Sequence, residues 1–152
     1  MNLTTEQFHA LSPLLTLATA AVGILIFLCV ERHHGAAAML LDDGTILTGT
    51  APDAINPSVE VCHETEPYCA AFRLGRRIVA SVCLYREPGG RTLVLSPCGV
   101  CRERLAVHGP NVLVAVADVE DATRVVWKPI KDVLPDYWMK VFPDAIDPGW
   151  AV

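Results

Sequence analysis

Four residues in two short segments have types and spacing suited to metal-assisted hydrolysis. Cys62 and Glu64 belong to the triplet Cys-His-Glu, and Cys98 and Cys101 belong to the segment Ser96–Arg102, which reads Ser-Pro-Cys-Gly-Val-Cys-Arg. Three thiolates can hold Zn²⁺ while the fourth tetrahedral position stays available for water. Zinc lowers the pKa of such a water to near neutrality, and a nearby carboxylate can move its protons. The pattern therefore predicts an open, hydrolytic zinc site.

The same cysteines are also compatible with a closed structural zinc site, completed by His63 or Cys69. Such a site would need neither Glu64 nor the Ser96-Pro97 pair that precedes the second cysteines, so we favour the open site. A further acid, Glu66, is interpreted as a charge that stabilises the start of a helix, not as a second catalytic acid.

Signals for helix ends place the second cysteine pair at the start of a helix. Pro97 at the first helical position, Gly109 after the last turn and Pro110 beyond it predict a helix over residues 98–108. Cys98 and Cys101 are three residues apart and would share one side of the first turn. The positive end of the helix stabilises thiolates there.

The Cys-His-Glu triplet is predicted to lie where another helix begins, one that ends at Gly75. In a regular helix Glu64 would point about 200° away from Cys62, so its carboxylate reaches the metal only if the helix begins at that point. Pro67 limits where this helix can begin, since proline is tolerated in a first turn but costs a backbone hydrogen bond farther in. We therefore predict a helix start at about His63 or Glu64.

The rest of the chain alternates between strand and helix signals. Residues 36–41 and 45–48 flank Asp42-Asp43-Gly44, which predicts a hairpin. Near-continuous β-branched runs at residues 78–85, 112–119 and 124–127 predict strands that are covered on both faces. The expected architecture is an α/β fold with a sheet between layers of helices.

The N-terminal segment is apolar enough to resemble a membrane span. The uncharged run over residues 7–30 is close to spanning length, but no Lys or Arg precedes it and Thr16 and Thr19 interrupt it. It also lacks the positive leading segment of a secretory signal. We favour a helix at about residues 4–20 and a buried strand at about 24–30 over a span within residues 14–30.

The length, net charge and cysteine content of the chain restrict the classes of function that it can have. A chain of 152 residues is about one domain, predicted here over 1–152, with a C-terminal helix and tail from about residue 128. A net charge of −5 offers no basic face for nucleic acid, so a small substrate is favoured. Cys29, Cys69 and Cys83 lie in apolar stretches and are interpreted as free thiols, which favours a reducing cytoplasm.

The metal motif resembles that of the small zinc-dependent cytidine deaminases, including their blasticidin S deaminase branch. Residues 36–49 resemble the first hairpin of that family, and Leu134–Trp138 resembles a C-terminal element, so that about residues 30–140 are covered. The resemblance implies a three-layer α/β/α sandwich with a mixed sheet of about five strands. It also implies a homo-oligomer, a tetramer being favoured and a dimer the alternative, with the apolar N-terminal helix in the interface.

The resemblance further implies pyrimidine salvage by hydrolysis of a cytosine nucleoside to uracil and ammonia. One zinc ion per chain, held by Cys62, Cys98 and Cys101, would acidify a water; Glu64 would take its proton, and the hydroxide would attack C4 of the ring. Glu64 would then deliver protons to N3 and to the departing amine. Arg102 resembles an arginine that hydrogen-bonds a ligand sulfur; an ordinary surface arginine is the alternative.

The substrate contacts are where this chain departs from the family. Relatives that bind ribose carry Asn-x-Glu upstream of the first cysteine, and the matching positions here are Ala51 and Asp53. Unpaired hydroxyls lower affinity, so plain cytidine is predicted to be a poor substrate unless Asn56, otherwise a turn residue, compensates. The implied substrate contacts are Ala51, Asp53, His63, Ser96, Pro97, Trp138 and His33.

Three of those contacts carry alternatives. His63 occupies a position that is usually alanine, and its side chain is expected at most to line the pocket. Trp138 is interpreted as an aromatic closing over the base, in its own or a neighbouring subunit, or else as a core residue. His33 either stacks on a ligand or lies on the surface.

Three function classes therefore remain. The first is a deaminase of free cytosine nucleosides, with an antibiotic of the blasticidin S type as the alternative substrate. The second is a non-catalytic zinc-binding protein on the same fold, which the presence of Glu64 argues against. The third is a polynucleotide deaminase, which the acidic charge argues against.

Overall fold

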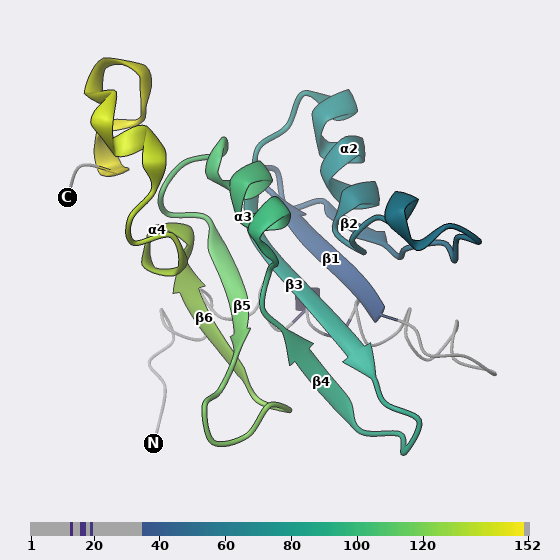
Figure 1. The fold of residues 1–152 in the computed structure, drawn as a ribbon. Helices are drawn as coiled ribbons and strands as arrows, with labels where there is room; N and C mark the ends of the chain where they lie inside the picture. The colour runs from purple at the N-terminus through teal and green to yellow at the C-terminus, as the bar shows by residue number, and fades with distance from the viewer. Residues whose placement is uncertain (1–12, 14–15, 18, 20–34, 151–152) are drawn as a thin grey trace.

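The described part of the chain folds into one mixed sheet with helices packed against it (Figure 1). The structure is a computed structural model and describes residues 13, 16–17, 19 and 35–150. Its strands are β1 (Gly35–Leu41), β2 (Ile46–Gly49), β3 (Ile78–Arg86), β4 (Thr92–Leu95), β5 (Leu113–Ala117) and β6 (Val125–Pro129).

The sheet has the order β2-β1-β3-β5-β6, and β4 pairs with β3 outside this path. The pairing of β3 with β5 is parallel, whereas the pairings of β1 with β2, β1 with β3, β3 with β4, and β5 with β6 are antiparallel. The predicted mixed α/β fold is confirmed. The described residues form a sheet of six strands where about five were expected, and β4 was not among the predicted strands.

The hairpin of β1 and β2 forms where the sequence predicts it. Gly44 has a φ of 86° in the turn, a backbone conformation that glycine adopts without strain. The Asp43 side chain caps the turn, since the Thr45 N–H donates to Asp43 Oδ1 at 2.9 Å. This hairpin brings the start of β1 beside the residues that follow β2.

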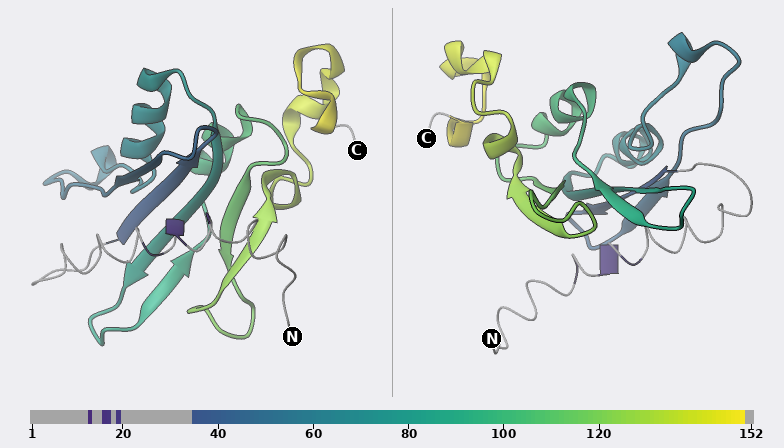
Figure 2. Two further views of the ribbon diagram at one scale, coloured as in Figure 1. Left: turned by 180° about the vertical axis from the view of Figure 1, so that it is seen from behind. Right: turned by 60° about the horizontal axis from the view of Figure 1, so that its bottom comes forward.

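Both faces of the sheet are covered, which explains the nearly continuous apolar runs in its strands. Along β5, Val114 contributes to a core that includes Ala71 and Leu105, whereas its neighbour Ala115 contributes to a core on the opposite face that includes Leu17. Leu17 is fully buried, and positions 13, 16, 17 and 19 are helical. Figure 2 shows these positions across the sheet from the other helices, as a three-layer sandwich requires.

Two helices on one face carry the candidate site. Helix α2 spans Thr65–Leu74 and ends at Gly75, which is left-handed with a φ of 64°. Helix α3 spans Gly99–Ala106, so it is shorter than predicted, and Cys98 rather than Pro97 marks its start. Pro97 lies before the N-cap because Cys98 is extended, with a ψ of 171°.

The C-terminal segment has less regular helix than predicted. Helix α4 covers only Ile130–Val133. Three short 3₁₀ helices follow at Trp138–Val141, Pro143–Ala145 and Pro148–Trp150. Proline at 135, 143 and 148 prevents a continuous helix.

The predictions for the N-terminal segment lie almost entirely outside the described residues. This holds for the helix at 4–20, apart from positions 13, 16, 17 and 19, and for the strand at 24–30. Among the residues that the structure describes, no helix combines the length and apolar character needed to cross a membrane.

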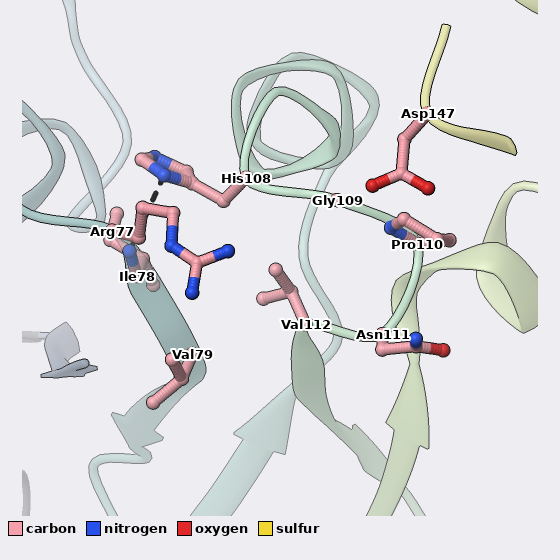
Figure 3. Close-up of a pocket in the computed structure, with 9 residues that line it drawn as sticks. All are labelled: Arg77, Ile78, Val79, His108, Gly109, Pro110, Asn111, Val112 and Asp147. Carbon is pink, nitrogen blue, oxygen red and sulfur yellow. Dashed lines mark hydrogen bonds between the residues drawn. The ribbon is translucent and has the colours of Figure 1, made fainter. Parts of the chain in front are cut away.

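His108, which follows α3, makes folding stability sensitive to acid. Its Nδ1 accepts the Ile78 N–H at 3.3 Å, and its ring borders a pocket with Arg77 and Asp147 (Figure 3). Burial lowers the pKa of His108, and Arg77 lowers it further. Because the unfolded chain then binds the proton more readily, stability is complete above the ordinary histidine pKa and falls as pH drops below it.

Acidification from about pH 7 to about pH 5 is therefore expected to lower the free energy of unfolding, and His108→Gln should reduce this dependence. Urea unfolding at several pH values measures both slopes. Equal slopes for the variant and the parent would contradict the assignment.

Candidate metal centre and active site

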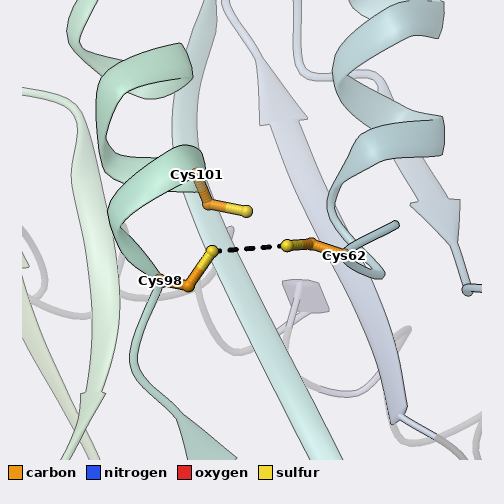
Figure 4. A group of neighbouring side chains, drawn as sticks. All are labelled: Cys62, Cys98 and Cys101. Carbon is orange, nitrogen blue, oxygen red and sulfur yellow. Dashed lines mark hydrogen bonds between the residues drawn. The ribbon is translucent and has the colours of Figure 1, made fainter. Parts of the chain in front are cut away.

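Three cysteine side chains converge between the starts of α2 and α3 (Figure 4). Cys62 precedes α2, Cys98 is the N-cap of α3, and Cys101 lies in its first turn. The three sulfurs lie within 4.8 Å of one another, and the Sγ atoms of Cys62 and Cys98 are 3.3 Å apart. Cys101 is buried, whereas Cys98 is exposed, so the group opens to solvent on one side.

The geometry of this group fits a metal ion. Zinc–sulfur bonds of about 2.3 Å in a tetrahedron place sulfurs about 3.8 Å apart. The observed 3.3 Å separation needs only a few tenths of an ångström of spreading. Within the described residues no His, Asp, Glu or further Cys joins the group, and three soft donors match the preference of zinc.

The three thiols differ in how readily they ionise. Burial opposes ionisation of Cys98, but hydrogen bonds from the Cys101 backbone N–H, from the Cys62 and Cys101 thiols and from the Val100 N–H together hold the pKa of Cys98 below its usual value. Burial raises the pKa of Cys62, and it raises the pKa of Cys101 much further. Thiolates at all three positions therefore need a positive partner, which a divalent cation supplies.

Glu64 lies next to Cys101, whose thiol forms a hydrogen bond with its carboxylate. It is the N-cap of α2 and only 6% exposed. Since the helix begins at Thr65, one residue after the predicted range, Cys62 lies outside the helix and both side chains can face the same centre. Burial raises the pKa of Glu64, while hydrogen bonding from Cys101 and the charge of Arg104 oppose the rise.

Two arginines of α3 lie near the segments that carry the cysteines. The Arg102 guanidinium donates to the carbonyl oxygens of Pro97 at 2.8 Å and Val133 at 3.2 Å. Arg104 instead donates to Thr65 Oγ1 at 2.8 Å, next to Glu64. Arg104 thus links α3 to the start of α2.

The predicted substrate residues divide into two groups. Ala51 and His63 meet, because the Ala51 N–H donates to His63 Nδ1 at 3.0 Å. Asp53 follows in the same exposed loop, and Ser96 and Pro97 lead directly into Cys98. These residues lie on the segments that carry the cysteines.

The remaining predicted contacts lie elsewhere. Trp138 donates to Glu103 at 3.3 Å and packs edge-on to Phe142 in the C-terminal segment. Neither contact involves the cysteines. The Asn56 side chain accepts the Ser58 N–H at 3.1 Å, as expected of a turn residue. His33 lies outside the described residues.

Comparison with known proteins identifies the class. The chain is 33% identical over 107 residues to the cytidine deaminase of Mycobacterium tuberculosis, covering 70% of this chain and 73% of that protein. It is 27% identical over 110 residues to the blasticidin-S deaminase of Bacillus cereus, covering 69% and 76%. No protein-family model matches the chain.

Solved structures agree with these relatives. The crystal structure of the cytidine deaminase from Bacillus anthracis has a TM-score of 0.82 at 35% identity, covering 90% of this chain and 97% of that chain. The chain belongs to the cytidine deaminase family. It is accordingly a hydrolase of the deaminase type, acting on a cyclic amidine.

Proposed function

We propose that the chain is a zinc-dependent deaminase that converts the cytosine ring of a free nucleoside to uracil and releases ammonia. The observation that carries the proposal is the buried carboxylate of Glu64, which forms a hydrogen bond with Cys101, a member of the thiol group of Cys62, Cys98 and Cys101. This combination supplies a metal site and a proton carrier in one place. A non-catalytic zinc site would have no use for the carboxylate.

The chemistry requires one proton carrier that works in both directions. A bound zinc ion would supply the Lewis acidity that makes water nucleophilic at neutral pH. Glu64 accepts a proton from the water as its oxygen bonds to C4 and passes this proton to N3. It then accepts the remaining proton of the new hydroxyl group and passes it to the amine, whose bond to C4 breaks. Burial raises the pKa of Glu64, which suits a group that must both accept and donate.

The environment of the centre supports this role. Three thiolates and one dication carry a net charge of −1, which weakens the Lewis acid. We propose that Arg104 offsets part of this charge, since its guanidinium is held beside Glu64 by Thr65. A fixed cation at this point also stabilises the ionised carboxylate before it takes up a proton.

The natural substrate is a small cytosine compound. A net charge of −5 disfavours a polynucleotide. Ala51 and Asp53 occupy the loop positions that match the ribose-binding residues of relatives. The side chain of Ala51 cannot form a hydrogen bond there. A blasticidin-S-type antibiotic is the second candidate, favoured by the similarity to the Bacillus cereus enzyme.

The proposal extends to the oligomeric state of the protein and to its cellular compartment. Trp138 is 58% exposed although it contacts Glu103 and Phe142, so part of its ring is available to a neighbouring subunit. We propose a homotetramer, with a dimer as the alternative. Pyrimidine salvage in a reducing cytoplasm agrees with the free thiols of the described residues, at positions 62, 69, 83, 98 and 101.

Ammonia release and ultraviolet absorbance on a panel of compounds test the activity. Cytidine, deoxycytidine, N4-modified cytidines and blasticidin S separate the substrate classes, and a single-stranded DNA or RNA editing assay tests the polynucleotide alternative. We expect turnover of at least one free nucleoside and none of the strands. Stoichiometric zinc with no turnover of any compound would favour the non-catalytic alternative.

Ala51→Asn is expected to improve binding of cytidine. The new amide restores a hydrogen bond to a sugar hydroxyl, worth about two- to tenfold in KM. With 2′,3′-dideoxycytidine, which lacks those hydroxyls, the gain should vanish. Steady-state kinetics on both substrates measure it, and an equal change on both would mean that position 51 does not face the sugar.

A further inference from the structure

The imidazole of His63 is engaged by the protein's own backbone on two sides. Its Nδ1 accepts the Ala51 N–H at 3.0 Å. A Cβ atom built on Gly35 would lie 2.2 Å from its Nε2, so the ring packs directly on the backbone at the start of β1. Only glycine at position 35 leaves room for the ring, which makes Gly35 and His63 a matched pair.

The contact belongs to a small network around the loop that follows β2. Thr50 Oγ1 donates to the Gly35 carbonyl at 2.8 Å, and the Thr50 N–H donates to Glu66 Oε2 at 3.2 Å. Residues 50 and 51 are thereby tied both to β1 and to the start of α2. Most residues from 52 to 61 are exposed, so the position of this loop depends on how its first residues are held.

His63 is also adjacent to Cys62, and Ala51 lies two residues before Asp53. A single hydrogen bond therefore connects the segment that supplies a metal-binding cysteine with the segment that supplies the predicted sugar contacts. Fixing these two segments relative to each other fixes the distance between the reacting ring and the groups that hold the rest of the substrate.

We propose that His63 is a positioning residue for the substrate: through the Ala51 N–H it holds the loop of Ala51 and Asp53 in register with the metal centre. The identity of the substrate rests on the proposed function. Because His63 acts through the loop and not on the reacting atoms, it affects substrate binding and leaves the chemical step unchanged.

Two variants of His63 distinguish the effect of its ring packing on Gly35 from the effect of its hydrogen bond with the Ala51 N–H. His63→Phe keeps a ring against Gly35 but cannot accept the Ala51 N–H, whereas His63→Asn offers an acceptor near the place of Nδ1. We expect His63→Phe to raise KM about five- to tenfold with kcat within about twofold of the parent, and His63→Asn to recover most of the loss. Zinc content should be unchanged in both.

A double substitution tests the matched pair independently of turnover. Gly35→Ala alone forces its methyl group into the imidazole and should lower the thermal midpoint. Adding His63→Ala removes the ring, so the double variant should be more stable than Gly35→Ala alone. A double variant less stable than either single variant would mean that the contact is not the one described.

Amide hydrogen exchange at Ala51 in the zinc-loaded protein directly measures the protection given by the hydrogen bond from the Ala51 N–H to His63. Exchange should accelerate about fivefold or more in His63→Phe and return towards the parent rate in His63→Asn. Unchanged exchange and KM in His63→Phe, or a loss confined to kcat, would overturn the proposal. If the parent deaminates no cytosine nucleoside, the proposed function fails while exchange still decides whether His63 holds the loop.

Discussion

Glu64→Ala is expected to retain its zinc and lose nearly all turnover. The variant keeps the three thiols of Cys62, Cys98 and Cys101, so metal binding has no reason to fail. It removes the buried carboxylate that forms a hydrogen bond with Cys101. Positioned proton transfer contributes about 10²- to 10⁴-fold to a rate, and here one group serves the water, the ring nitrogen and the leaving amine. We therefore expect kcat to fall at the upper end of that range.

The measurement combines zinc analysis with ammonia release under saturating substrate. Glu64→Gln adds a test of the proton itself, because it keeps size and polarity but cannot carry a proton, and it should be as inactive as Glu64→Ala. Glu120→Ala, which removes an exposed acid between β5 and β6, serves as the control with parental activity. Full activity in Glu64→Ala would remove the proposed proton carrier.

Cys101→Ala is expected to weaken zinc binding about 10²-fold and to abolish activity. Zinc sites with four protein ligands bind with about 10–16 kcal/mol, so one ligand is worth about 3 kcal/mol, or about 10²-fold in affinity. Cys101 is also the buried member of the trio, and its removal leaves two sulfurs. The rise of the thermal midpoint on adding zinc should then require about 10²-fold more zinc than in the parent, because the stabilisation that binding gives the folded state depends on the affinity.

Cys69→Ala is the matched control for this experiment. Cys69 is an exposed thiol on α2 and lies outside the sulfur group. Competition with a chelator gives the zinc affinity of both variants. If Cys69→Ala lost zinc as Cys101→Ala does, the closed structural site considered from the sequence would regain support.

The sulfur group could be predicted because two of its three cysteines lie in one short segment of the sequence. Two cysteines three residues apart share one side of a helix turn, and proline and glycine mark the ends of that helix. The Cys62 segment could be assigned to the same centre only through resemblance, since 36 residues separate it from Cys98. The fold closes that separation by placing α2 and α3 on one face of the sheet.

The contacts of the two arginines of α3 agree with helical geometry. Arg102 follows Cys101 by one residue and so points about 100° away from it, whereas Arg104 follows by three and returns to nearly the same side. The structure accordingly directs Arg102 to backbone carbonyls and Arg104 to Thr65. The resemblance pointed to Arg102, whereas the helical period favours Arg104, the arginine whose charge acts on Glu64.

Other features depended on contacts that no local pattern encodes. Strand β4 has four residues between a glycine turn and Ser96, and it becomes a strand by pairing with β3. The role of His63 depends on the backbone of Ala51, twelve residues earlier, and on the missing side chain at Gly35. Such partners become visible only when the hairpin and α2 are placed together.

X-ray absorption at the zinc edge of the purified protein tests the open metal site most directly. Three sulfur scatterers at about 2.3 Å and one oxygen scatterer at about 2.0 Å are predicted, with one zinc per chain. Four sulfurs, or the scattering pattern of a coordinated histidine, would mean that a protein atom closes the position needed by water. Either result, or protein purified without zinc-binding capacity, would contradict the account.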